Sequence, residues 1–210
     1  MKKLAFSLFA FAAPFVLVST GQAADLYAGV SVVGSSYNDP KIKNSFSGGS
    51  TVSHNSELDN GLGVLARFGS KYGSIRAEIE LGYRDSSIGA VTGQSTLTGV
   101  SGDVGIYTAM LNGAYDFDMD SAFTPFVSAG FGGLYADGEI NYTDTDGEAS
   151  YEDGEAVTVA GQVGLGVSYE LSPAVDLVGS YSLLGAPTSD LGVNQYLVIH
   201  NAQIGVNYNF

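Results

Sequence analysis

The chain has 210 residues, including 29 glycines and 13 tyrosines, no cysteine and no tryptophan, and its 22 acidic and 8 basic residues give a formal net charge of −14. Without cysteine there can be no disulfide framework, and so acidic a chain repels phosphate polymers, which excludes nucleic acid as an expected partner. Every base after Lys3 lies between Lys41 and Arg84, and residues 85–210 contain no Lys or Arg.

The amino-terminus has the three parts of a secretory signal peptide. Residues 1–3 are basic, residues 4–18 are apolar apart from Pro14, and small residues follow, with Gly21 and Ala23 at the −3 and −1 positions of a cut after Ala23. The alternative is a transmembrane helix, but the apolar run is shorter than the roughly twenty residues that a helical span needs. We therefore expect residues 1–23 to be a signal peptide and residues 24–210 to form one exported domain.

Eight segments of the remaining chain alternate with the period of two that is typical of a strand with one apolar face. In the clearest one, residues 75–84, apolar residues alternate with Arg76, Glu78, Glu80 and Arg84. In chain order the expected outward faces include Leu26, Ala28, Val30, Val32; Leu62, Val64, Ala66, Phe68; Ile75, Ala77, Ile79, Leu81, Tyr83; Tyr107, Ala109, Leu111, Tyr115; Val127, Ala129, Phe131, Tyr135; Val157, Val159, Val163, Leu165, Val167, Tyr169; Leu177, Tyr181, Leu183; and Tyr196 to Phe210 in steps of two. The first, fourth and fifth segments leave two registers open, one residue apart.

The connections between these segments alternate in length. Residues 70–73, 118–123 and 172–174 are expected to be tight turns, and the expected polar loops are 36–60, 85–103, 136–155 and the shorter 185–194. Tight turns at one rim and long loops at the other are typical of a transmembrane β-barrel. An even number of strands places both termini at the rim of the tight turns.

The last strand ends on an aromatic residue and places Val206, Tyr208 and Phe210 on its apolar face. This ending resembles the terminal signal that the barrel assembly machinery of bacterial outer membranes reads. A soluble barrel of the lipocalin kind is the rival fold, but it would hide apolar groups inside. Here the expected inward set is arginine, glutamate, glutamine, asparagine and glycine, as lipid exposure requires.

With its opening Leu26-Tyr-Ala-Gly29, the turn and strand from Asp118 to Gly133 and the final Tyr208-Asn-Phe210, the chain resembles the eight-stranded outer-membrane barrels of OmpX-like, OmpA-barrel-like and opacity-like surface proteins. The resemblance implies an all-β, eight-stranded antiparallel up-and-down transmembrane β-barrel with short periplasmic turns and long extracellular loops. It also implies a place in the outer membrane, in contact with lipid and lipopolysaccharide.

Five charged residues are expected to form a cluster inside the barrel: Arg67, Arg76, Glu78, Glu80 and Arg84. Residues two apart on a strand share a face, and residues on paired strands reach each other. Because eight strands leave room only for side chains, we expect a plug of salt bridges in which Arg76 and Arg84 neutralise Glu78 and Glu80. A gated or proton-conducting interior is the alternative.

The acidic third loop gives a weak indication of calcium binding, through Asp144, Asp146, Glu148 and Asp153, because oxygen-rich loops suit this ion. The match to a calcium loop fails at the first ligand, so a solvated acidic loop is the favoured interpretation. The only histidines, His54 and His200, lie outside any serine and carboxylate constellation. We therefore expect no cofactor, no structural metal and no enzymatic activity.

These observations together predict a surface protein of a Gram-negative outer membrane, an adhesin-like or antigen-like barrel that contacts a host or cell-surface ligand through its loops. A small pore is the main alternative, and a lipid-modifying enzyme is a third.

Overall fold

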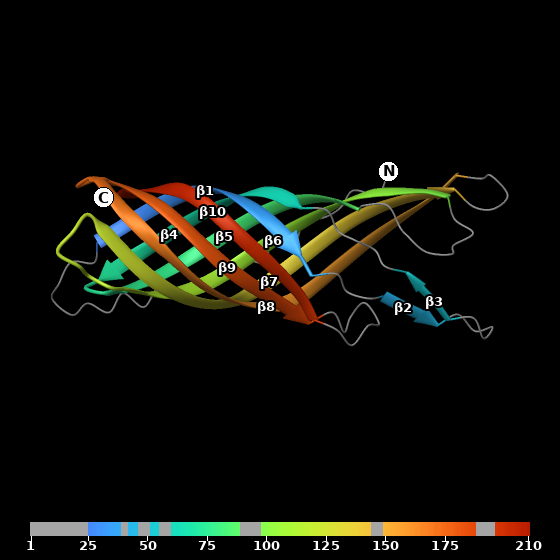
Figure 1. The fold of residues 1–210 in the computed structure, drawn as a ribbon, viewed down its shortest axis with the longest axis horizontal. Coiled ribbons are helices and arrows are strands. Elements are labelled where there is room, and N and C mark those ends of the chain that lie inside the picture. Colours follow the sequence, from blue (N-terminus) through green and yellow to red (C-terminus); the bar gives the residue numbers. More distant parts are fainter. Residues whose placement is uncertain are drawn as a thin grey trace.

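Eight strands close into a single antiparallel barrel, drawn as a ribbon in Figure 1, and two short strands pair separately. The computed structural model describes residues 25–38, 42–45, 51–54, 60–88, 98–143, 149–187 and 196–210. Its strands are β1 (Asp25–Tyr37), β2 (Ile42–Ser45), β3 (Thr51–His54), β4 (Gly61–Tyr72), β5 (Ile75–Ile88), β6 (Thr98–Asp116), β7 (Phe123–Thr143), β8 (Ala149–Ser172), β9 (Val175–Pro187) and β10 (Tyr196–Asn209). None of the described residues belongs to a helix long and apolar enough to cross a membrane. The predicted fold class is confirmed.

Each barrel strand pairs with its neighbours along the chain, and β1 closes the barrel by pairing with both β4 and β10. The connections 73–74, 117–122 and 173–174 lie at one end, which we call the inner rim, and the opposite end is the outer rim. Gly73, at the first central position of the turn between β4 and β5, has a φ of 58°, as a type II′ hairpin turn requires. Both Asp25 and Phe210 lie at the inner rim, as predicted. Asp25 is opposite Lys71, beside the turn 73–74, and the N–H of Asn209 donates to the carbonyl of Ala174 in the turn 173–174 at 2.9 Å.

The apolar faces point outward at the positions that the alternation predicts. Leu62, Val159 and Phe131 are exposed by 76%, 71% and 67%, whereas Arg67 and Thr108, on the opposite face, are buried. Of the two registers left open in the first, fourth and fifth segments, the structure has the one that places Val30, Tyr107 and Phe131 outward, because these side chains are exposed. This arrangement is the inverse of that in a soluble barrel, and it places the apolar surface where lipid surrounds it.

Four strands extend further toward the outer rim than predicted. β7 and β8 pair as far as Thr143 opposite Ala149, and β5 and β6 pair as far as Ile88 opposite Gly102, so much of the expected loops 136–155 and 85–103 is strand. In Figure 1 the outer ends of β6, β7 and β8 run far beyond the rest of the barrel. The prediction was wrong here because a sheet outside the lipid has water on both faces, so its side chains need not alternate in polarity.

The first expected loop, residues 36–60, also contains strands. β2 and β3 pair antiparallel, with Ile42 opposite His54 and Ser45 opposite Thr51. These two strands form a sheet of their own and share no ladder with the barrel.

The barrel interior is apolar near the outer rim, which the sequence analysis did not predict. An apolar cap fills that part of the lumen, consisting of Tyr37, Ile106, Met110, Leu134, Ala160, Leu184, Ala186 and Ile199. The expectation of an inward set made only of polar residues and glycine was therefore wrong. In a closed, narrow lumen a buried polar group without a partner is costly, so apolar side chains are an alternative filling to a polar network.

Candidate functional site

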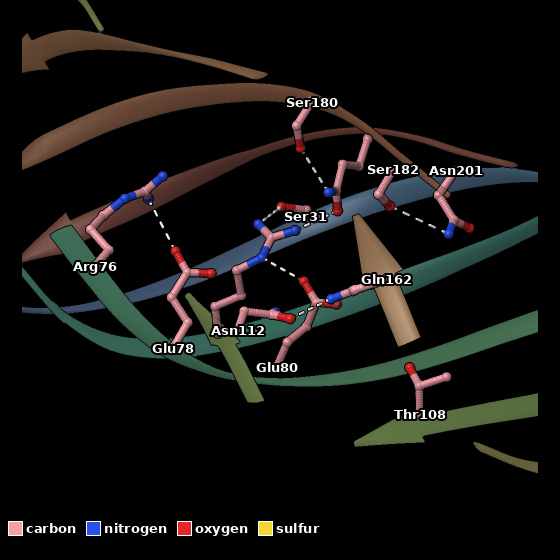
Figure 2. A network of polar contacts seen from close by, with 12 residues as sticks. Ser31, Arg76, Glu78, Glu80, Thr108, Asn112, Gln162, Ser180, Ser182 and Asn201 are labelled. Atoms are coloured by element: carbon pink, nitrogen blue, oxygen red, sulfur yellow. Dashed lines mark hydrogen bonds and ion pairs between the residues drawn. The ribbon is translucent and has the colours of Figure 1, made fainter. Parts of the chain in front are cut away.

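A polar network fills the lumen between the apolar cap and the inner rim (Figure 2). Arg67 on β4 lies directly opposite Glu80 on β5, and its Nε donates to Glu80 Oε2 at 2.7 Å. Its other nitrogens reach β1 and β10, because Nη1 donates to Ser31 at 3.0 Å and Nη2 donates to Gln203. The Arg67 guanidinium thus connects β1, β4 and β10 with β5.

Arg76 forms the second ionic centre, closer to the inner rim. Its Nη1 lies 3.1 Å from Glu78, and its Nε donates to Asp116 at 3.0 Å. The guanidinium also lies over the ring of Phe126, 4.5 Å from its centroid, an arrangement that favours a cation. Asp116 follows Tyr115, which was expected to point outward, but it was not included in the expected charge cluster. The signal that could have included it is its place on the inward face of the strand that pairs with residues 75–88.

Neutral side chains extend the hydrogen bonding of the two ionic centres across the lumen (Figure 2). Gln162 on β8 donates to Glu80 at 3.2 Å and to Asn112 at 2.7 Å, and Gln203 donates to Ser180 at 2.7 Å. Tyr27 on β1 donates its hydroxyl to Glu78. These bonds satisfy buried carboxylates, which would be costly if left without partners.

Arg84 differs from the other two arginines because no carboxylate of the described residues lies within 4.0 Å of its guanidinium. It is 1% exposed, and its Nε and Nη1 donate to Asn201 and Thr108, each at 3.1 Å. Arg84 therefore forms no ion pair with Glu78 or Glu80 and does not contribute a salt bridge to the expected plug. Glu80 accepts from Arg67, its direct neighbour in the ladder. Arg84 lies four residues further along β5, toward the apolar cap.

Little empty space remains within the polar network. A cavity of about 30 Å³ lies between Arg67, Arg76, Glu80 and Gln162, which is room for roughly one or two waters. Nη2 of Arg76 is buried and has no hydrogen-bond partner among the described residues. With the apolar cap on one side and ion pairs on the other, the described lumen is filled by side chains, as expected of eight strands.

Two belts of aromatic side chains bracket the lipid-facing surface. Toward the outer rim Tyr107 lies between Tyr83 and Tyr135, with ring centroids 4.9 and 5.8 Å apart. At the inner rim the aromatic pairs are Tyr115–Phe117, Phe123–Tyr169 and Tyr208–Phe210. Tyrosine and phenylalanine girdles at the two interfaces are typical of transmembrane barrels.

The expected assembly-signal residues share one exposed face of the carboxy-terminus. Val206, Tyr208 and Phe210 are exposed on the outward face, and the rings of Tyr208 and Phe210 meet edge to face at 5.3 Å. Their place in the structure leaves the assembly role a prediction.

The expected calcium ligands are brought together only in part. Asp144, Asp146 and Glu148 lie outside the described residues, and Asp153 lies on β8 opposite Glu139 on β7. Within the described part of the chain no group of three or more His, Asp or Glu residues could hold a metal ion. The calcium site stays a prediction.

The two histidines belong to different sheets. His54 ends β3, and His200 lies on the outward face of β10, where its Nδ1 and the hydroxyl of Tyr181 share a hydrogen bond of 2.5 Å. Tyr181 is the hydrogen-bond partner of the His200 imidazole, and none of the described carboxylates bonds to that ring. The absence of enzymatic activity remains an expectation.

Comparisons with known proteins agree with this architecture. The chain resembles Neisserial surface protein A at a TM-score of 0.56 and 16% identity, covering 90% of this chain and 100% of that one. It resembles Ail, the attachment invasion locus protein of Yersinia pestis, at a TM-score of 0.52 and 12% identity, with 90% and 100% covered. It resembles the outer membrane protein OprG of Pseudomonas aeruginosa at a TM-score of 0.50 and 16% identity, with 90% and 97% covered.

No curated protein matches the chain at a significant level. The family of outer membrane protein beta-barrel domains, in contrast, matches residues 5–210, which is nearly the whole chain. With its closed eight-stranded barrel, lipid-facing apolar surface and two aromatic belts, this chain belongs to the outer membrane protein beta-barrel family and is a protein of the outer membrane.

Proposed function

We propose that this protein is a surface-exposed interaction protein whose barrel is an anchor and whose contacts are made by the extension of β6, β7 and β8 beyond the outer rim. The observation that carries the proposal is the length of these strands, since β7 and β8 pair continuously from Phe123 opposite Tyr169 to Thr143 opposite Ala149. A paired strand advances about 3.4 Å per residue. Such a hairpin is much longer than the roughly 9–11 residues that cross the lipid.

The filled lumen supports an anchor over a pore. Arg67, Arg76, Glu78 and Glu80 bond to one another or to neutral side chains across the barrel, and the apolar cap closes the outer part. Ions would have to displace both layers in order to pass. A small pore remains the second candidate function, and electrical recording distinguishes the two.

The acidic outer rim restricts the class of partner. Asp85, Asp103, Asp137 and Glu155 are exposed there, and residues 85–210 contain no Lys or Arg. Ail has been seen with the heparin analogue sucrose octasulfate, but a polysulfated ligand would be repelled by these carboxylates. A basic host or cell-surface partner suits this rim, and divalent cations would bridge its carboxylates to lipopolysaccharide phosphates.

The test is to replace residues 137–155 with a short Gly-Ser turn. We expect the barrel to insert normally, with unchanged heat-modifiable gel mobility, because β7 and β8 below Ala136 keep their partners. Cells that carry the shortened protein should lose binding to basic host-cell surfaces, and chelator or high salt should weaken binding by the intact protein.

The matched control is a protein in which Asp118 and Asp120, at the inner rim, are replaced by Asn. This control removes acidic charge from the side that faces the periplasm and should leave surface binding intact. Full binding by cells with the shortened protein would contradict the proposal. Steady single-channel conductance of the intact protein in planar bilayers would favour the pore instead.

A further inference from the structure

The lipid-facing surface has an apolar groove of about 670 Å³ over five consecutive strands of the barrel, β5, β4, β1, β10 and β9. Five of its outward side chains lie directly opposite one another across the ladders, and we call them the groove row: Leu81, Ala66, Val30, Val206 and Leu177. Ser31 and Leu65, which are buried, also line the groove. Because their side chains point inward, the floor of the groove is the backbone of the barrel wall.

The groove exists because short side chains lie between rows of larger ones. Ala66, in the groove row, has a methyl group only. The next outward row toward the inner rim contains Phe68 and Tyr208, and the second row toward the outer rim contains Leu62 and Tyr181. All four of these side chains are exposed. The short side chains are therefore bordered on both sides by larger ones.

The groove row runs obliquely through the lipid-facing part of the wall. Neighbouring strands lie about 4.8 Å apart, so five strands span roughly 19 Å. Leu81 lies six residues from the inner end of β5, whereas Leu177 lies two residues from the inner end of β9, so the row descends toward the inner rim. With strands tilted by about 40°, the descent is roughly 12 Å, comparable to the ~15 Å of hydrocarbon in one leaflet.

The chemistry of the groove fits a hydrocarbon chain. Its outward side chains are apolar apart from the hydroxyl of Tyr83. A flat wall contacts an acyl chain from one side, whereas a groove contacts it from the floor and from both borders, which increases the dispersion attraction. A second copy of this barrel is the rival occupant. Two concave surfaces placed face to face would enclose an empty space, however, and close packing does not tolerate one of this size.

We propose that this groove is a binding site for one acyl chain of a phospholipid of the inner leaflet. The chain lies along the groove row from Leu177 toward Leu81. Its headgroup lies at the inner rim beside the aromatic pair Tyr208–Phe210, because Val206 at the low end of the row is two residues from Tyr208. The bound lipid thus covers the ladder between β1 and β10 that closes the barrel. This site is separate from the extension beyond the outer rim and does not depend on its function.

Native mass spectrometry of the protein in detergent micelles with palmitoyl-oleoyl-phosphatidylethanolamine tests the site. The spectrum should show an adduct of one lipid per barrel. Ala66→Phe places a ring on the floor of the groove and should lower the adduct by about fivefold or more through steric exclusion. Ala129→Phe makes the same change at an exposed alanine of β7 outside the groove and should leave the adduct unchanged. Val32→Phe is a second filling variant, and heat-modifiable gel mobility shows which variants fold.

The absence of tryptophan from the sequence permits a second measurement, which locates the bound chain. Tyr83→Trp introduces a single indole at the groove. Phe131→Trp introduces one outside it, and both positions lie eight residues from the inner ends of their strands. Titration with dibrominated dioleoyl-phosphatidylethanolamine in detergent should quench the Tyr83→Trp protein saturably and the Phe131→Trp protein only weakly. Adding Ala66→Phe to the Tyr83→Trp protein should abolish the saturable quenching.

Equal lipid adducts of the native protein and a folded filling variant, or equal quenching at the two tryptophan positions, would overturn the inference. A mass of two protein chains without lipid would also overturn it, because the groove would then be an interface between copies of this chain. None of these results bears on the proposed function, which is tested separately by shortening the hairpin of β7 and β8.

Discussion

The three buried arginines of the lumen have the same side chain but different partners. Arg67 and Arg76 each contact a carboxylate at 3.1 Å or less, whereas Arg84 donates to the neutral side chains of Asn201 and Thr108. Removing one partner of a buried ion pair leaves the other charge uncompensated, whereas replacing a buried ion by an apolar group of similar size can be neutral. The cost of losing each arginine should therefore differ.

Arg67→Met should destabilise the barrel by about 3–5 kcal/mol, because Glu80 would remain buried without its cation. Arg84→Met should cost about 1 kcal/mol or less, because the loss of two hydrogen bonds to neutral acceptors is offset by removing a buried charge that has no carboxylate partner. Urea unfolding in detergent, followed by tryptic protection, measures both. Equal losses would mean that Arg84 is paired in solution, or that the whole cluster is hydrated.

Glycines on the two faces of the wall should respond differently to the same substitution. A Cβ on Gly130, which faces the lumen, would lie 1.8 Å from Asn112 Oδ1, whereas one on Gly113, which faces outward, would meet nothing within 4 Å. We expect Gly130→Ala to cost about 1–3 kcal/mol through overpacking. Gly113→Ala should stay within about 0.5 kcal/mol of the native protein. The same unfolding assay gives the comparison, and a neutral Gly130→Ala would show that the Asn112–Gln162 contact is easily displaced.

At the scale of the strand, alternation of polarity predicted where each strand crosses the lipid and which face points outward. It did not predict where the strands end, because the pattern comes from lipid on one face, and that difference disappears beyond the outer rim. β7 and β8 continue there through backbone pairing, with Asp137 opposite Glu155 and Gly138 opposite Gly154. The sequence analysis therefore interpreted a paired hairpin as a loop.

The carboxy-terminal strand carries the prediction about assembly. Deleting Phe210 should leave export intact but cause periplasmic accumulation and degradation, because the outward aromatic pair with Tyr208 is lost. Phe210→Tyr keeps an aromatic ring at the same position and should assemble normally. Immunoblots of outer-membrane and periplasmic fractions measure the outcome, and normal outer-membrane levels of the deleted protein would refute an assembly role for this residue.

At the scale of the whole molecule, the sequence by itself determined the class of fold and its solvent. Period-two alternation in eight segments and the alternating lengths of the connections follow from local chain geometry, so one sequence is enough to predict them. The same alternation predicts which residues point inward, and these include Arg67, Arg76, Glu78, Glu80 and Arg84.

The tertiary structure decided which of these groups meet and what fills the remaining lumen. Asn201 on β10 reaches Arg84 on β5 across the barrel, and the apolar cap collects side chains from strands far apart in sequence. The alternation predicts that a side chain points into the lumen. It does not predict the position of that side chain along the barrel axis or the residue that faces it across the lumen, because both depend on the stagger of the strands in the closed barrel. The ladder of β8 with β7 likewise begins at Ala149, whereas its ladder with β9 begins only at Gly161, because the relative lengths of neighbouring strands are set by their pairing in three dimensions.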